Sequence, residues 1–228
     1  MAATVFPPAT DNEPALPDDN NNGGSTPGGP NEPDHRIVQL EPQRPATPSN
    51  AYRIVAVVAI IWITALFGTL AIVLESRWAH SPNWVSIGLP QIFYLNTAIL
   101  LLSSLSVEWA RRSLRAGRTV RCIRGIVVSL WLGFLFLAGQ AFAWQEISLR
   151  GLHFDTNLGS FFLYLITGAH ALPLLGGMAL LGYLGFLIAR SGRAVNRQAA
   201  LGSLALFWHF TAALWLCLLA LLFVTIQR

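Results

Sequence analysis

Two histidines lie inside long apolar stretches of this 228-residue chain. His170 belongs to one stretch and His209 to the next along the sequence. Two imidazoles at matching depth on neighbouring helices could ligate a haem iron. The sequence favours a simpler interpretation, in which each imidazole hydrogen-bonds a neighbouring helix or a lipid headgroup, because the apolar stretches hold no third histidine.

Uncharged polar side chains also occur inside the apolar stretches, and Asn96 and Gln140 are two of them. Such groups commonly form hydrogen bonds between helices within a membrane. The sequence contains no cluster of metal ligands, no glycine-rich phosphate loop and no nucleophile triad. We therefore expect no catalytic residue, and no cofactor or metal bound by this chain.

The carboxylates nearest to the apolar stretches stand at their ends. Glu108 precedes Arg111 and Arg112, and Glu146 precedes Arg150 by one helical turn. Side chains at this spacing are neighbours on a helix, so we expect ion pairs at the level of the lipid headgroups. A proton pump or ion-coupled transporter normally needs an acid within a span. A small five-helix transporter stays only a third alternative, because the apolar stretches contain no internal carboxylate.

The elements that must position these side chains are five stretches without Asp, Glu, Lys or Arg. Each is long enough to cross roughly 30 Å of hydrocarbon as an α-helix. We therefore predict an all-α, polytopic membrane protein with a bundle of five transmembrane helices, in accord with its 54% hydrophobic and 11% charged residues. The stretches are Ile54–Leu74, Ile87–Val107, Gly125–Gln145, Leu158–Ala189 and Ala199–Ile226.

The first part of the chain differs from the rest in composition. Residues 1–50 are rich in Pro, Asn, Gly and acids. A segment of this kind cannot bury enough apolar surface to offset the entropy lost on ordering. We predict a disordered N-terminal tail over residues 1–50 and one transmembrane domain over residues 51–228.

All 15 basic residues are arginines, and they alternate between the links that join the apolar stretches. The tail, the second link and the fourth link hold most of them, whereas Arg77, Arg150 and Arg228 belong to the other side. The positive-inside rule then puts the N-terminus in the cytoplasm and the C-terminus outside. The arginines behind the net charge of +4 lie mostly beside apolar stretches, where they set the orientation in the membrane. We therefore do not expect nucleic-acid binding.

Four segments, in order along the chain, resemble motifs of subunit III of the haem-copper oxidases. They are LNTAILLLSS at 95–104 with WARR at 109–112, LGF at 132–134 with Gln140 and Glu146, GSFF at 159–162 with TGAH at 167–170, and FWHF at 207–210 with Trp215. The likeness extends from about Ile54 to Ile226. The motifs thus indicate a resemblance to a known family, in addition to what the single residues indicate.

The resemblance implies a function and its setting. Subunit III commonly has seven helices, and five spans resemble the shorter bacterial form. It holds no haem or copper; it binds beside catalytic subunit I and with subunit II, steadies subunit I and supports proton uptake. The chain is accordingly similar to an accessory subunit of a cytochrome c oxidase in a bacterial inner membrane, with haem and copper in partner subunits and structural phospholipid bound. The candidate contacts to lipid or between helices are Asn96, Gln140, Glu146, His170, Trp208 and His209.

The sequence departs from the family motifs at four polar positions. Ala212, Pro173 and Ala143 replace an acid, a second histidine and a glutamate, and the glutamate expected within Ile54–Leu74 is missing. These departures leave two other functions open. The chain could be a subunit III-like accessory protein of a nitric oxide reductase or a quinol oxidase, or a haem-ligating membrane anchor that uses His170 and His209.

Overall fold

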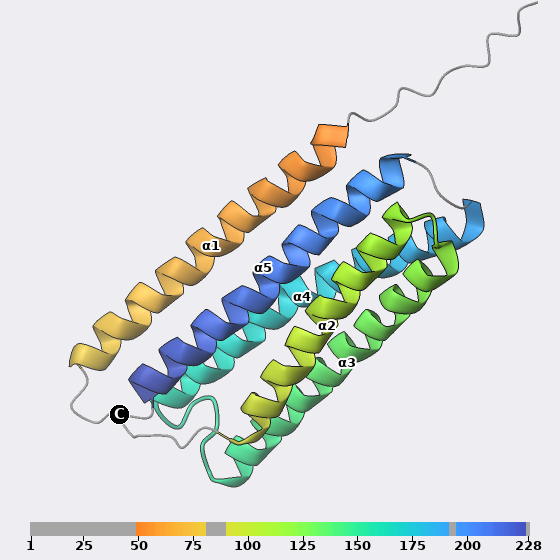
Figure 1. Ribbon diagram of the computed structural model, residues 1–228. Coiled ribbons are helices and arrows are strands. Elements are labelled where there is room, and N and C mark those ends of the chain that lie inside the picture. The colour runs from red at the N-terminus through yellow and green to blue at the C-terminus, as the bar shows by residue number, and fades with distance from the viewer. Residues whose placement is uncertain (1–48, 81–89, 192–194, 227–228) are drawn as a thin grey trace, which may run out of the picture. The chain divides into compact units, whose positions relative to one another are not determined.

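The computed structural model describes residues 49–80, 90–191 and 195–226, and this part of the chain is all α-helical (Figure 1). Its five helices are each long and apolar enough to span a membrane, as predicted. The tail predicted for residues 1–50 lies outside the described residues, except for its last two. The helices are α1 (Ser49–His80), α2 (Ile92–Arg115), α3 (Thr119–Leu149), α4 (Leu158–Ser191) and α5 (Val195–Ile226).

The helices begin and end where local chemistry requires, and most extend beyond the charge-free stretches. α2 starts after Pro90, whose carbonyl accepts a hydrogen bond from the N–H of Phe93 at 3.1 Å. The turn to α3 uses Gly117 at φ 75°, a conformation that glycine adopts without steric cost. Most of the arginines near this turn lie within the ends of the two helices. Their long side chains can reach the lipid headgroups, so the helices extend beyond the charge-free stretches.

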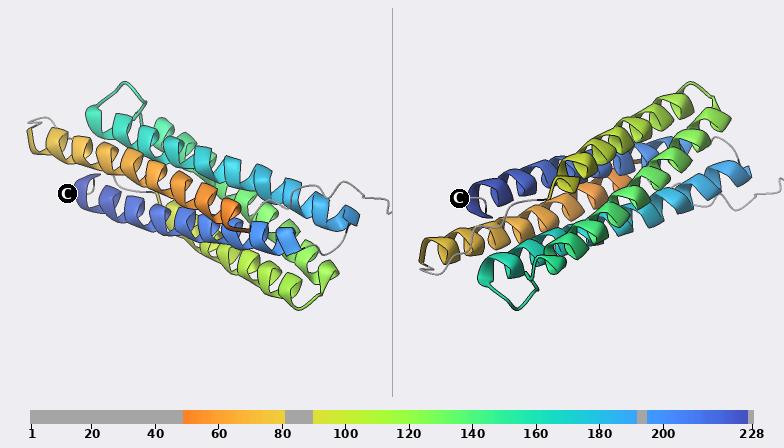
Figure 2. Two further views of the ribbon diagram at one scale, coloured as in Figure 1. Left: turned by 90° about the horizontal axis from the view of Figure 1, so that it is seen from above. Right: turned by 90° about the horizontal axis from the view of Figure 1, so that it is seen from below.

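Helices α2 to α5 enclose the larger hydrophobic core, to which Phe93, Phe136 and Trp215 contribute. α1 packs against α5 and, less extensively, against α4 (Figures 1 and 2). A second, smaller cluster joins α1 to these two helices and includes Phe67 and Phe162. Most of α1 remains exposed and apolar, which suits a surface that faces lipid or a partner protein.

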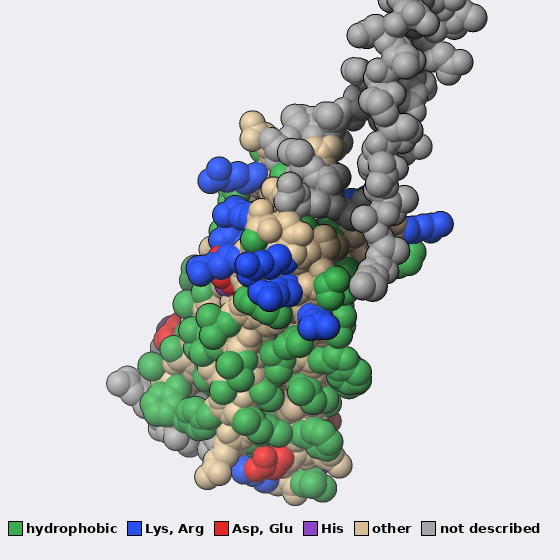
Figure 3. All heavy atoms as spheres, turned by 45° about the vertical axis from the view of Figure 1, so that its right-hand side comes forward, with side chains coloured by type: hydrophobic (Ala, Val, Ile, Leu, Met, Phe, Trp, Pro, Cys, Tyr) green, Lys and Arg blue, Asp and Glu red, His purple; other side chains and the backbone are tan. Residues whose placement is uncertain are grey.

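Arginines gather at one end of the bundle, where the α2–α3 turn lies (Figure 3). We call this the Arg-rich end. Among the described residues, the opposite end holds Arg77 and Arg150. This asymmetry is the basis of the orientation predicted above, in which the Arg-rich end faces the cytoplasm. That orientation stays a prediction.

We predict that Gly125→Ala destabilises the bundle. A Cβ atom on Gly125 of α3 would lie 2.8 Å from the Cβ of Ala110 on α2 and 3.1 Å from its Cα, so the two backbones would have to separate. We expect the free energy of unfolding to fall by about 1–3 kcal/mol, measured by thermal denaturation in detergent.

Gly202→Ala provides the matched control, since a Cβ there meets nothing within 4 Å. Replacing a helical glycine by alanine at an open position raises stability by up to about 1 kcal/mol. Equal effects of the two substitutions would show that the approach of α2 to α3 at Gly125 is not a tight contact.

Candidate functional site

A first group of polar side chains joins three helices in the half of the bundle nearer to the Arg-rich end. The indole N–H of Trp208 on α5 donates to Ser103 Oγ on α2 at 3.1 Å, and Ser103 Oγ donates to the carbonyl of Ser129 on α3 at 3.1 Å. Ser129 Oγ donates to the carbonyl of Gly125 at 2.8 Å. We call Ser103, Ser104, Ser129, Trp208 and His209 the serine cluster.

His209 connects the serine cluster to an ion-pair group at the end of α2. Its Nδ1 hydrogen-bonds Ser104 Oγ, and its Nε2 lies 3.7 Å from Oε2 of Glu108. Glu108 accepts hydrogen bonds from Arg111 Nε at 2.7 Å and from Arg112 Nε at 2.8 Å, which are the ion pairs expected from the spacing. Because it pairs with two guanidinium groups of the same helix, this carboxylate stabilises the end of α2.

A second group occupies the core nearer to the Arg-poor end. Asn96 of α2, Gln140 of α3 and His170 of α4 are all buried. The ring of His170 lies 5.2 Å from that of Trp215 on α5 and 5.9 Å from that of Phe136 on α3, measured between centroids. We call Asn96, Gln140, His170 and Trp215 the amide layer.

The amide layer contains polar atoms that lack a partner. Both side-chain polar atoms of Asn96, of Gln140 and of His170 have no hydrogen bond within the described part of the chain. The indole N–H of Trp215 is already used, because it donates to Thr97 Oγ1 at 3.0 Å. A buried donor or acceptor without a partner costs about 1–3 kcal/mol, so this layer departs from the usual rule that such groups are satisfied.

Glu146 lies apart from both groups. Its carboxylate pairs at 2.5 Å with Arg150, which directly follows the last residue of α3, and both side chains are about half exposed. Nearby, Trp144 donates from its indole N–H to Thr167 Oγ1 at 3.0 Å and so joins α3 to α4. The six candidate residues of the sequence therefore occupy three places: the serine cluster, the amide layer and this helix end.

The two histidines that could have held a haem face different surroundings. His170 contacts the rings of Phe67, Phe136 and Trp215, whereas His209 bonds Ser104 and lies near Glu108. Joint ligation of one iron would require both imidazoles to face a common space. This arrangement gives the haem-anchor hypothesis no geometric support.

Sequence reasoning did not select Ser103, Ser104, Thr97 or Ser129 as site residues, although all but Ser129 lie in a motif segment. Trp208 donates to Ser103 and Trp215 to Thr97, and these two indoles stand seven residues apart on α5, on nearly the same face of that helix. Ser103 and Thr97 stand six residues apart on α2, which runs antiparallel to α5. The similar separation along the two helix axes is the signal that could have revealed the contact.

A family model for cytochrome c oxidase subunit III matches residues 54–226. The chain belongs to this family. The cytochrome c oxidase subunit 3 of Gallus gallus is 33% identical over 124 residues, which cover 54% of this chain and 46% of that protein. Those of Lemur catta and Pisaster ochraceus are 32% and 31% identical over 124 residues. The matched part is thus about half the length of these curated relatives.

The residues that resemble subunit III motifs are also contacts between helices. Trp208 and Trp215 of the last motif segment donate hydrogen bonds to Ser103 and Thr97 of the first. These segments are more than a hundred residues apart in the sequence, as the separations of 105 and 118 show. In this member of the subunit III family, the motif residues therefore hold α5 against α2.

We predict an energetic coupling between Trp208 and Ser103. Trp208→Phe keeps an aromatic ring but removes the indole donor, and Ser103→Ala removes the acceptor. In a double-mutant cycle on the purified protein, we expect a coupling energy of about 0.5–1.5 kcal/mol in the free energy of unfolding.

Trp62→Phe is the control for the loss of an indole, because Trp62 is 72% exposed on α1. It should show no coupling to Ser103→Ala. Additive effects of Trp208→Phe and Ser103→Ala would contradict a direct hydrogen bond between α5 and α2.

Proposed function

We propose that this chain is the non-redox accessory subunit III of a respiratory haem-copper terminal oxidase. It stabilises the catalytic subunit I and supports proton uptake during aerobic electron transport, with cytochrome c as the electron donor. It lies in the inner membrane of a bacterium with its N-terminus in the cytoplasm, and it contacts subunits I and II. Haem and copper belong to those partner subunits.

The observation that carries this proposal is the family match over residues 54–226. The structure supports a bracing role through two features. The polar groups of the serine cluster form hydrogen bonds between the helices of this chain itself. The outer surface is apolar along much of α1 and α3, including Trp62, Trp131 and Phe142, which suits lipid or another membrane protein.

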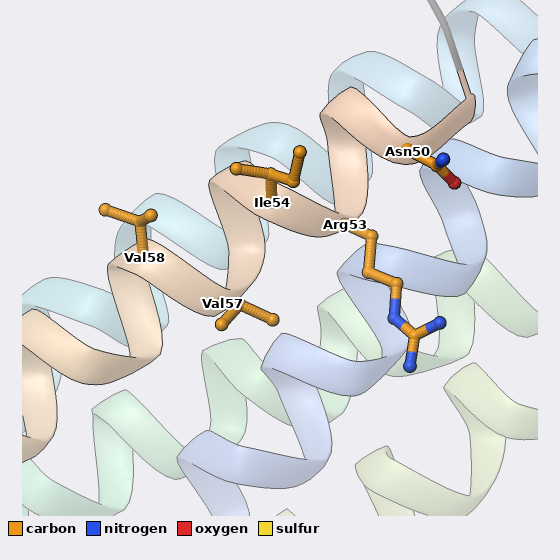
Figure 4. Close-up of a pocket in the computed structure, with 5 residues that line it drawn as sticks. All are labelled: Asn50, Arg53, Ile54, Val57 and Val58. Carbon is orange, nitrogen blue, oxygen red and sulfur yellow. The ribbon is translucent and has the colours of Figure 1, made fainter.

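A shallow groove at the Arg-rich end of α1 supports the part of the proposal that concerns phospholipid. It is lined by Asn50, Arg53, Ile54, Val57 and Val58 (Figure 4). The guanidinium of Arg53 can pair with a phosphate, and the aliphatic side chains further along α1 can contact an acyl chain. This arrangement fits a lipid lying against α1 with its headgroup at the Arg-rich end.

The decisive experiment is purification of the tagged chain from its native membrane in a mild detergent. We expect it to bring down a polytopic subunit that carries haem and copper, together with subunit II, and the purified complex to reduce oxygen. Recovery of the chain always alone contradicts the proposal. A partner with haem and non-haem iron but without copper would support the nitric oxide reductase alternative, and a quinol-oxidising complex would support the quinol oxidase alternative.

An optical spectrum of the chain by itself separates the accessory role from the haem anchor. We expect no Soret band from the full chain after it has been dissociated from its partners. A Soret band that disappears in both His170→Phe and His209→Ala would instead support ligation of haem by these two residues.

We predict that His209→Ala weakens the complex without removing its haem spectrum. The substitution removes the bond to Ser104 and leaves Glu108 without its imidazole neighbour, so α5 is held less firmly against α2. The measurement is the amount of this chain retained with the haem-bearing subunit after a detergent wash. His80→Ala, at the exposed end of α1, is the control, and equal retention of both variants would contradict a structural role for His209.

A further inference from the structure

The amide layer combines three buried polar side chains from three helices at one level of the bundle. We propose that Asn96, Gln140 and His170 form an internal binding site for water molecules. The site is built from this chain alone, and it does not depend on the oxidase function proposed above.

Contacts between α2 and α3 put Asn96 and Gln140 at one level. A Cβ atom on Gly139 would lie 2.0 Å from Oδ1 of Asn96, so the Asn96 side chain fills the space that the missing side chain of Gly139 leaves. Gln140 follows Gly139 in the sequence and is also buried. The two amides are therefore close in depth within the core.

Aromatic contacts bring His170 and Trp215 to the same level. Phe136, one helical turn before Gln140, contacts the rings of both His170 and Trp215, with centroid distances of 5.9 Å and 5.0 Å. Trp215 in turn bonds the hydroxyl of Thr97, the residue that follows Asn96. These contacts put His170 and Trp215 near the level of Asn96 and Gln140.

The donors and acceptors of this layer are balanced, and this balance points to water. An asparagine or glutamine amide supplies two N–H donors and a carbonyl oxygen with two lone pairs, and a neutral imidazole supplies one donor and one acceptor. A cation would leave the N–H groups unmet, and an anion would leave the oxygens unmet. Water donates and accepts equally, and buried waters typically bind polar groups that the protein leaves unsatisfied.

The serine cluster shows that the same helices can satisfy buried polar groups directly. There Ser103, Ser129 and Trp208 bond one another or the backbone. In the amide layer the corresponding indole of Trp215 donates to Thr97 and cannot also serve the amides. The serine cluster thus supplies hydrogen-bond partners for its own polar atoms, whereas the amide layer does not. We therefore assign the bound water to the amide layer.

X-ray hydroxyl-radical footprinting tests the proposal, because radiolysis produces radicals wherever water is bound and oxidises the adjacent side chains. The sample is the full chain with any subunits it retains, in detergent. We expect Trp215 to be oxidised several-fold faster than Trp208. Trp208 is a matched control, because both indoles are buried to 1% exposure or less and both donate to a hydroxyl of α2. Oxidation of Trp215 no faster than Trp208 overturns the proposal.

A variant tests whether the amides hold the water. Gln140→Leu has a similar size but no donor or acceptor, and we expect it to slow the oxidation of Trp215 severalfold while that of Trp208 stays the same. An unchanged rate at Trp215 overturns the role of Gln140.

A high-resolution cryo-EM map of the unmodified protein gives an answer even if the variant does not fold. Density for water within hydrogen-bond distance of the Asn96 and Gln140 amides supports the site. Direct contact between the two amides without intervening density overturns it, and so does density with the coordination of a metal cation.

Discussion

The need to satisfy polar groups inside hydrocarbon governs the structure of this protein. Lipid offers no hydrogen-bond partners, so the backbone forms helices, and a buried polar side chain is stabilised when it has a partner within the bundle or a bound water. Threonine hydroxyls meet the requirement locally, as Thr167 and Thr211 do by donating to carbonyls one turn earlier. Buried and partly buried tryptophan indoles reach another helix instead: Trp208 and Trp215 join α5 to α2, and Trp144 joins α3 to α4.

Helix α2 is the element to which these contacts converge. It packs closely on α3 through Gly125 and Gly139, where small residues let the two helices approach. On its other side it accepts the indole donors of α5 at Ser103 and Thr97. The helix with the lowest hydropathy of the five thus packs between α3 and α5, because its polar side chains are used in contacts between helices.

The family match and the physical analysis support each other at particular residues. In the motif segment FWHF at 207–210, the indole and the imidazole form hydrogen bonds with serines of α2, so these motif residues have a structural role. Pro173 and Ala212, where the sequence departs from the family motifs, lie inside helices α4 and α5. Ala212 is buried in the core, whereas Pro173 is partly exposed.

The sequence by itself determined the helices, because the absence of charge over long stretches leaves no other secondary structure in a membrane. It also determined local pairs such as Glu108 with Arg111 and Arg112, since helical spacing alone makes them neighbours. Only the tertiary structure decided that His209 bonds Ser104 and that His170 lies against Trp215. Those partners are far apart in the sequence, and which face of each helix turns inward depends on how all of the helices pack together.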